Sequence, residues 1–439
     1  MKMANAILLA CAMTAGGAFG AATVSEVIVR QQWPWKPQVN VDFTVVGSQS
    51  EVAEMTMGAY SGTRFLGYVP PAKCHGDTIV TSNGPKRITF DPTEIPFLVE
   101  AGTMADFRID VIPNVTDPED ILYMIFDLRK TPGEEGQVEY VTAFSLTNGV
   151  WGTWEKSRWG MLDTPSWTGV TEDDKYKTTH LVVRRIPAGA FTYGTTAGTD
   201  AYRDEDIVRK SVSLDAYYIG VFETTVSQYN YIQDKDSQAG ASMKPSTYKY
   251  YRTSTAKNAI RGNSATGTGV WPTNKGVRSN GIMGLLRART GLDFDLPTEA
   301  QWEKAARGGS SGIYYSSNSE SFADTQNMLK TLAWCRANDA NVHEVGLKLP
   351  NDFGLYDVLG NVGEVVLDWY ASAYVPADAN PDGPDSPSEA SKRVTKGYTY
   401  YGWEARPEAE SIHLGGRDSI TDNDASTQIG YRVCCPSPF

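Results

Sequence analysis

Residues 296–309, LPTEAQWEKAARGG, are the most informative stretch of the chain. Thr298 and Gln301 have the spacing of a capping box, in which each side chain bonds an otherwise free backbone N–H group at a helix start. Glu299 follows at the positive end of the helix dipole, and Gly308 is a residue that commonly ends a helix. The stretch therefore predicts a short helix between Thr298 and Gly308 that packs through Trp302 and its alanines.

Other blocks flank this helix at regular intervals. Residues 181–194 have the pattern of a strand, a turn and a second strand, and Thr224 or Thr225 is placed to cap a helix with apolar residues at helical spacing. Downstream come NDFGLYDVLGNVGE at residues 351–364 and the closing IGYRV at residues 429–433.

In this order and spacing, the blocks resemble the formylglycine-generating-enzyme (sulfatase-modifying-factor) family over more than half of the chain. The resemblance implies a C-type-lectin-like fold that is rich in glycine and irregular structure, with two helices on small twisted sheets. We therefore expect such a domain over residues 180–439. The complete chain is predicted to be α+β, with an all-β sandwich-like domain preceding this one.

The resemblance also implies a Ca²⁺ site. The family's ligands map onto the carboxylates of Asp357 and Glu364 and onto the backbone carbonyls of Gly360 and Val362. A hard cation prefers several oxygen ligands, and a tight glycine turn between two carboxylates can supply them. Gly363 stands where the family usually has Trp, so one packing contact differs.

The catalytic segment departs from the family pattern. The family's oxidases carry two cysteines shortly after a strand that resembles residues 393–397, and these thiolates bind copper. Residues 398–417 contain no Cys here, and the adjacent pair Cys434 and Cys435 lies beyond the segment. We therefore expect neither copper binding nor the family's oxidase chemistry, and we expect His413 to be a surface-loop histidine.

A secreted, non-catalytic binding protein is the function that these observations favour. The former catalytic face would hold a glycan or protein ligand through aromatic, charged and amide side chains. The predicted contacts are Tyr398, Tyr400, Tyr401, Trp403, Arg406, Arg417, Asp418, Asp422, Asn423 and Asp424. The composition of residues 398–428 also fits a region diversified by a diversity-generating retroelement. Alternatives are a divergent sulfatase-modifying oxidoreductase and a structural cell-envelope protein.

The N-terminal part predicts strands. Apolar residues alternate over residues 39–45 and again over 107–111, whereas residues 123–128 form a continuous apolar run that is typical of a central strand. We assign residues 23–150 to the sandwich-like domain, as a structural or docking module, and residues 151–179 to a linker.

Residues 1–22 have the charge, apolar stretch and small residues of a signal peptide cleaved near Gly20, with a lipoprotein signal at Cys11 as the alternative. The protein is thus expected to be secreted, periplasmic or at the cell surface. No later segment is apolar enough to cross a membrane, and the net charge of −12 argues against nucleic acid as a partner. A disulfide from Cys335 to Cys434 or Cys435 and free buried thiols both remain open.

Overall fold

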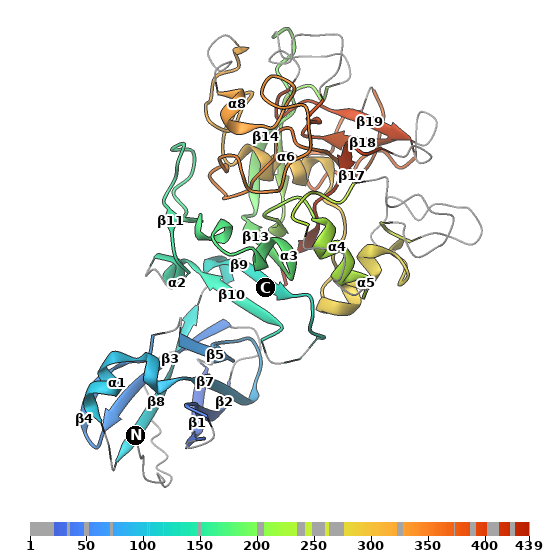
Figure 1. The fold of residues 1–439 in the computed structure, drawn as a ribbon. Coiled ribbons are helices and arrows are strands. Elements are labelled where there is room, and N and C mark those ends of the chain that lie inside the picture. Colours follow the sequence, from blue (N-terminus) through green and yellow to red (C-terminus); the bar gives the residue numbers. More distant parts are fainter. Residues whose placement is uncertain are drawn as a thin grey trace. The chain divides into compact units, whose positions relative to one another are not determined.

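The computed structural model describes residues 22–438, apart from 33–35, 48–51, 71–72, 103, 105, 117, 133, 135, 148–150, 200–205, 235–241, 248–259, 263–275, 323–327, 373, 387–391, 402–411 and 422–425. The chain forms two compact units (Figure 1). One contains residues up to 122 together with 140–151, and the other contains residues 123–139 together with 152–438. The predicted signal peptide lies outside the described residues.

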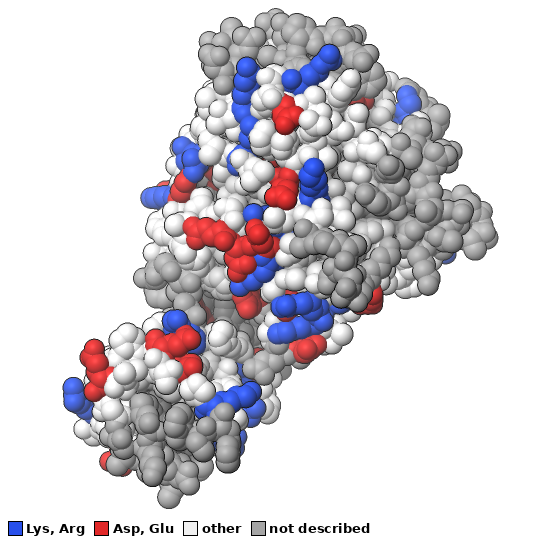
Figure 2. All heavy atoms as spheres, viewed as in Figure 1, with Lys and Arg blue, Asp and Glu red and all other residues white. Residues whose placement is uncertain are grey.

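The charged side chains that Figure 2 displays are mixed in sign. Lys and Arg alternate with Asp and Glu over the described part of that face, without a broad field of one sign. None of the helices in the described ranges combines the length and apolarity needed to cross a bilayer.

The N-terminal unit contains two antiparallel sheets. One has the order β1 (Thr23–Gln31), β2 (Val39–Val46), β7 (Gly84–Phe90), β5 (Cys74–Gly76). In the other, β3 (Val52–Ser61) pairs with β4 (Arg64–Tyr68), β6 (Ile79–Val80) and β8 (Phe107–Thr116). The short elements are η2 (Pro92–Glu94), α1 (Pro96–Ala101), η3 (Pro118–Asp120) and α2 (Ala143–Thr147).

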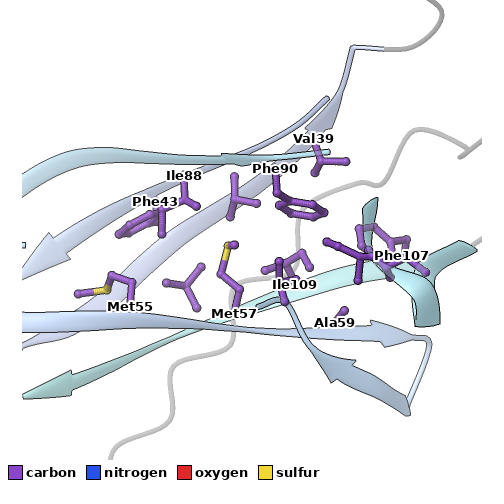
Figure 3. Packing of buried hydrophobic residues seen from close by; sticks show 14 of the residues in the cluster. Val39, Phe43, Met55, Met57, Ala59, Ile88, Phe90, Phe107 and Ile109 are labelled. Atoms are coloured by element: carbon purple, nitrogen blue, oxygen red, sulfur yellow. The ribbon is translucent and has the colours of Figure 1, made fainter. Parts of the chain in front are cut away.

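One hydrophobic core joins the two sheets. The alternating residues of β2 and β7, among them Phe43 and Phe90, meet Met57 of β3 and Ile109 of β8 (Figure 3). Every second residue of these strands points into this core, which is the periodicity expected for a sheet with one buried face.

The apolar run that predicted a central strand belongs to the other unit. It forms β9 (Ile121–Asp127) in a five-stranded sheet ordered β10 (Val138–Thr142), β9, β13 (His180–Ile186), β16 (Tyr217–Gly220), β21 (Cys434–Pro436). β9 pairs with β13 from Tyr123 to Asp127. A central strand was predicted correctly, but the predicted boundary at residue 150 was wrong, because periodicity does not tell which sheet a strand joins.

Residues 152–179 are likewise not a linker. They contain β11 (Trp154–Glu155), β12 (Ser166–Trp167), η4 (Gly169–Thr171) and α3 (Lys175–Thr178). Trp167 is buried between the rings of Tyr123 and Tyr176, and its backbone N–H donates to the Tyr123 hydroxyl at 2.8 Å. The Asp352 carboxylate accepts hydrogen bonds from the backbone N–H groups of Trp159 and Met161. The segment is therefore an integral layer of the larger unit.

A second sheet carries the C-terminal region. Its order is β19 (Asp418–Thr421), β18 (Lys392–Lys396), β17 (Gly363–Trp369), β20 (Ile429–Gly430), and a separate hairpin joins β14 (Gly189–Tyr193) to β15 (Lys210–Leu214). The helices are α4 (Val226–Ile232), α5 (Ile282–Thr290), α6 (Glu299–Arg307) and α8 (Leu329–Leu332).

The predicted helix ends are confirmed. In α6, Thr298 and Gln301 form a complete capping box and Gly308 ends the helix in the left-handed conformation. In α4, Thr225 is the capping residue, with Gln228 as its partner.

Candidate functional site

The segment after β18 turns its first tyrosine inward. Tyr398 has a φ of 61° and is buried, and its ring lies 6.0 Å from that of His413. A Cβ atom on Gly416 would lie 2.1 Å from the Tyr398 hydroxyl, so only glycine leaves room for the phenol there. Ile412 and Leu414 beside it are also fully buried. Tyr398 was predicted as a ligand contact, but it packs in the interior at the position of the family's catalytic segment.

His413 is also an interior residue and not the surface histidine that was expected. Its imidazole is 1% exposed, and Nε2 lies 3.6 Å from the carboxylate of Asp206, which is buried as well. The ring of Phe322 lies 6.4 Å away. The acid partner of His413 could not be read from the sequence, because it lies more than 200 residues away along the chain.

Arg417, another predicted ligand contact, belongs to a buried network of ion pairs under α6. Its guanidinium donates to Glu299 at 2.9 Å and to the backbone carbonyl of Ala371. Lys396 lies 3.6 Å from Glu299 and 2.9 Å from Glu303, and Glu303 also pairs with Arg307. These charged side chains are almost completely buried. They position α6 against β18 and do not face solvent.

The local charges control the ionisation of this network. Burial alone would raise the pKa of Glu303, but the charges of Lys396 and Arg307 outweigh burial and hold the pKa below its ordinary value. Burial and the charge of Glu299 raise the pKa of Asp368 well above its ordinary value. Asp368 also accepts the backbone N–H of Glu299 at the start of α6.

The next residues of the segment turn outward. Tyr401 is 40% exposed and Tyr400 is half-buried, so part of each ring is accessible to solvent. Asp418 is partly exposed on β19, where it accepts the backbone N–H of Ser419. The remaining predicted contacts lie outside the described residues: Trp403, Arg406, Asp422, Asn423 and Asp424.

Asn361 connects this surface to two other loops through its backbone and amide. Its N–H donates to the Trp334 carbonyl, its own carbonyl accepts the N–H of Tyr400, and its Oδ1 accepts the N–H of His343. Asn tolerates the left-handed φ of 54° that this arrangement requires. One residue therefore sets the relative positions of three loops.

These loops bring together side chains that the sequence did not single out. The rings of Trp334 and His343 stack at 3.7 Å, and Lys348 Nζ lies 3.8 Å from the centroid of Trp334. The guanidinium of Arg336 lies 5.6 Å from the centroid of Tyr401. We define the Asn361 face as Trp334, Arg336, His343, Lys348, Tyr400 and Tyr401. For Trp334, Arg336, His343 and Lys348, the sequence offered only a Trp and several charged residues in a stretch without periodicity, which did not predict a binding surface.

The loop with the predicted Ca²⁺ ligands fits a cation in part. Asp357 is fully buried, and its Oδ2 accepts the N–H of Gly346 while its Oδ1 has no partner. Glu364 is different, because both of its oxygens accept bonds from Arg432 and Oε2 also accepts the Trp302 indole N–H. Val362 contributes its N–H to Glu223. Asp357 thus retains a free ligand atom, whereas Glu364 is engaged by protein donors.

The buried carboxylates around the predicted Ca²⁺ loop carry more negative charge than the neighbouring cationic side chains offset. In the described part of the chain, Glu223, Asp357 and Glu364 are buried near the guanidinium of Arg432, and the charge of the partly exposed Lys348 also acts on Asp357. Burial and then the charges of Asp357 and Glu364 raise the pKa of Glu223 well above its ordinary value. Burial raises the pKa of Asp357 to about 6. Among the described residues, no three His, Cys, Asp or Glu side chains converge as a ready metal site, so a cation would also need backbone carbonyls.

Among the described residues, the cysteines are in no disulfide bond: Cys74, Cys335, Cys434 and Cys435. Burial raises the pKa of Cys74 to about 12 and raises those of Cys434 and Cys435 further. Because the thiolate is the metal ligand and nucleophile, burial keeps Cys74, Cys434 and Cys435 in their unreactive form.

Residues 168–435 match the family model described as the sulfatase-modifying factor enzyme 1-like domain. The chain belongs to this family. The assignment confirms the resemblance seen in the sequence. The described elements are mostly strands with a few helices, in line with the predicted α+β class, and residues 398–417 lack the family's cysteine pair.

Curated relatives of the family include both active and inactive proteins. The formylglycine-generating enzyme of Streptomyces coelicolor is 30% identical over 146 residues, which are 31% of this chain and 45% of the relative. The inactive C-alpha-formylglycine-generating enzyme 2 of Bos taurus is 32% identical over 142 residues, covering 31% and 42%. The matched regions of the first relatives span half of their length or less.

Solved structures also resemble the chain. Treponema denticola variable protein 1 is 24% identical, with a TM-score of 0.41, over 58% of this chain and 95% of that protein.

Proposed function

We propose that this protein is a non-catalytic member of its family that binds a glycan or protein ligand through the Asn361 face. The observation that carries the proposal is the inward packing of Tyr398, Ile412 and Leu414 at the position of the family's catalytic segment. Residues 398–417 contain no Cys that could supply the family's thiol pair. The adjacent loop retains exposed and half-buried aromatic side chains.

The chemistry of the Asn361 face suits recognition. Aromatic rings provide rigid contact area, and Trp, Tyr and Arg are the residues that most often dominate binding energies. Three loops fixed by backbone hydrogen bonds lose little conformational entropy on binding. The inactive Bos taurus relative supports the proposal in a limited way, because its name shows that the family includes members without the activity.

The proposed setting is extracellular. We infer export from the N-terminal signal sequence, which directs the protein to the medium, the periplasm or the cell surface. Diversification of residues 398–428 by a retroelement belongs to the same proposal, and a neighbouring template repeat and reverse-transcriptase gene would test it.

Calcium is part of this proposal. Asp357 and the carbonyls of Gly360 and Val362 would hold the cation. Glu364 would remain paired with Arg432 and support the bound cation from there. When bound, Ca²⁺ supplies positive charge to a buried cluster of three carboxylates that faces one guanidinium. The bound ion would thereby fix the loop that contains Asn361.

The binding proposal is tested with the complete exported chain on a glycan array and on an array of extracellular proteins. The double variant Tyr401→Ala and Arg336→Ala should lose at least tenfold in affinity for any ligand found, with an unchanged melting temperature. Asp163→Ala, at an exposed site on the same unit, is the matched control.

An activity assay with a sulfatase-type Cys peptide and copper provides the opposing test. Formation of formylglycine would refute the non-catalytic assignment. If the Tyr401→Ala and Arg336→Ala double variant binds the ligand as well as Asp163→Ala does, the Asn361 face is not the binding site.

A further inference from the structure

The outer face of the N-terminal unit's second sheet carries a group of aromatic rings. Along β3, Met57 and Ala59 point into the core, so Gly58 and Tyr60 point outward. On β4, Tyr68 lies opposite Gly58 and Phe65 lies opposite Tyr60. The pairing register therefore places three aromatic side chains next to one another on the solvent side.

The rings form a continuous surface. Tyr60 and Phe65 have centroids 5.2 Å apart, and Phe65 and Tyr68 have centroids 4.9 Å apart. A Cβ atom on Gly58 would lie 3.2 Å from the Tyr60 ring and 3.5 Å from the Phe65 ring, so these rings lie against its bare backbone. Phe65 is 45% exposed and Tyr68 is 56% exposed. Such exposure of clustered rings is costly unless something covers them.

A charged pair borders the rings on the other side of β3. Arg108 of β8 lies opposite Tyr60, and its guanidinium is 4.4 Å from the centroid of the Tyr60 ring. Asp110, opposite Gly58, pairs with Arg108 at 2.9 Å. Both side chains are partly exposed, so hydrogen-bond donors and acceptors remain accessible beside the rings.

We propose that this aromatic face, comprising Tyr60, Phe65, Tyr68, Arg108 and Asp110, binds an uncharged polysaccharide. One face of a pyranose ring presents C–H groups, which pack on the negative face of an aromatic ring, while hydroxyl groups surround its rim. Arg108 and Asp110 offer these hydroxyls both a donor and an acceptor. Their charges cancel, so the face favours a neutral chain over an acidic or basic one.

The strand edge beside the face is poorly suited to a protein partner. β4 has only five residues, and its pairing with β3 shifts register between Ala59 and Tyr60. A short and irregular edge disfavours addition of a strand from another chain. The aromatic face, and not the strand edge, is therefore the surface suited to a ligand.

Affinity electrophoresis of the complete chain in gels containing β-glucan, xylan, mannan or galactan tests the proposal. At least one of these neutral polysaccharides should retard the protein. The double variant Phe65→Ala and Tyr68→Ala should bind it at least tenfold more weakly, whereas Tyr68→Phe keeps the ring and should retain binding. Val46→Ala, at a 52% exposed apolar residue of β2 in the other sheet, is the matched control and should change nothing.

Three outcomes would overturn the proposal. They are the absence of retardation by all four polysaccharides, equal loss of binding in Val46→Ala, and a change of oligomeric state in the double variant, which would assign the rings to self-association. Circular dichroism confirms that each variant is folded. This site is independent of the Asn361 face: Tyr401→Ala should leave the retardation intact, so the two proposals can fail separately.

Discussion

Two buried groups of charges in the larger unit differ in how they are compensated. Under α6, Glu299 and Glu303 each have two cationic partners among Lys396, Arg307 and Arg417, so three cations serve these two residues and the neighbouring Asp368, whose pKa burial and the charge of Glu299 raise. In the loop cluster, Glu223, Asp357 and Glu364 share the guanidinium of Arg432, with the partly exposed Lys348 acting on Asp357 from a distance.

This difference indicates different roles. A buried carboxylate with complete pairing is fixed structure, because removal of either partner leaves an isolated charge in the interior. Buried carboxylates with too few partners must gain a proton or a cation, because isolated charges are expensive to bury. The first cluster is therefore scaffold, and the second is where the chain responds to its solution.

Loss of Lys396 should produce the largest effect. Lys396→Met removes a shared partner of Glu299 and Glu303 and should lower the free energy of unfolding by about 3–5 kcal/mol. Chemical denaturation measures the change. Lys156→Met breaks an exposed pair with Asp163 and should have no measurable effect. Similar stability of both variants would show that the buried pairs are not structural.

Calcium removal should have a smaller effect and should act only through the loop cluster. A ligand at one hundred times its Kd stabilises the folded state by about 2.7 kcal/mol, so EDTA should lower the melting temperature. Asp357→Asn removes the carboxylate with the free oxygen and should abolish the response to EDTA. Lys396→Met, if it folds, should keep the response. A chelator response that persists in Asp357→Asn would place the cation elsewhere.

The pH dependence of stability at Asp357 should be a still smaller change. The folded-state pKa of Asp357 is raised to about 6, so its contribution to stability is present below its unfolded pKa and is lost as pH rises through 6. In EDTA, acidification from pH 7 to pH 5 should therefore favour folding at this site. Asp357→Asn should lose this gain in stability on acidification. In the unchanged protein with Ca²⁺ added, acidification should instead lower stability, because protons then compete with the cation for Asp357. Melting curves across this range, compared with Lys156→Met, would measure it.

Substitution on the surface should have the smallest effect on stability. Tyr401→Ala truncates an exposed ring and should change the free energy of unfolding by less than about 0.5 kcal/mol. Tyr398→Ala empties a buried site and should cost about 3 kcal/mol or more. Equal costs for the two tyrosines would contradict the assignment of one to the interior and one to the face.

Local sequence chemistry predicted what depends on neighbouring residues. The capping box of Thr298 and Gln301 and the helix end at Gly308 are short-range interactions, and all are present. Partnerships between distant residues were not predictable in this way. Arg417 appeared suited to bind a ligand because Glu299, its partner, is 118 residues away. β9 was assigned to the wrong unit because a strand's composition does not specify its neighbour.

The bonds that Asn361 makes to Trp334, Tyr400 and, through its amide, His343 all end on backbone atoms of those residues. Side chains at the three positions can consequently be exchanged without loss of the bonds that hold the loops. Such an arrangement separates the shape of a surface from its specificity. It would allow natural variation, or a combinatorial library at positions 334, 343, 400 and 401, to change the ligand while the framework beneath stays the same.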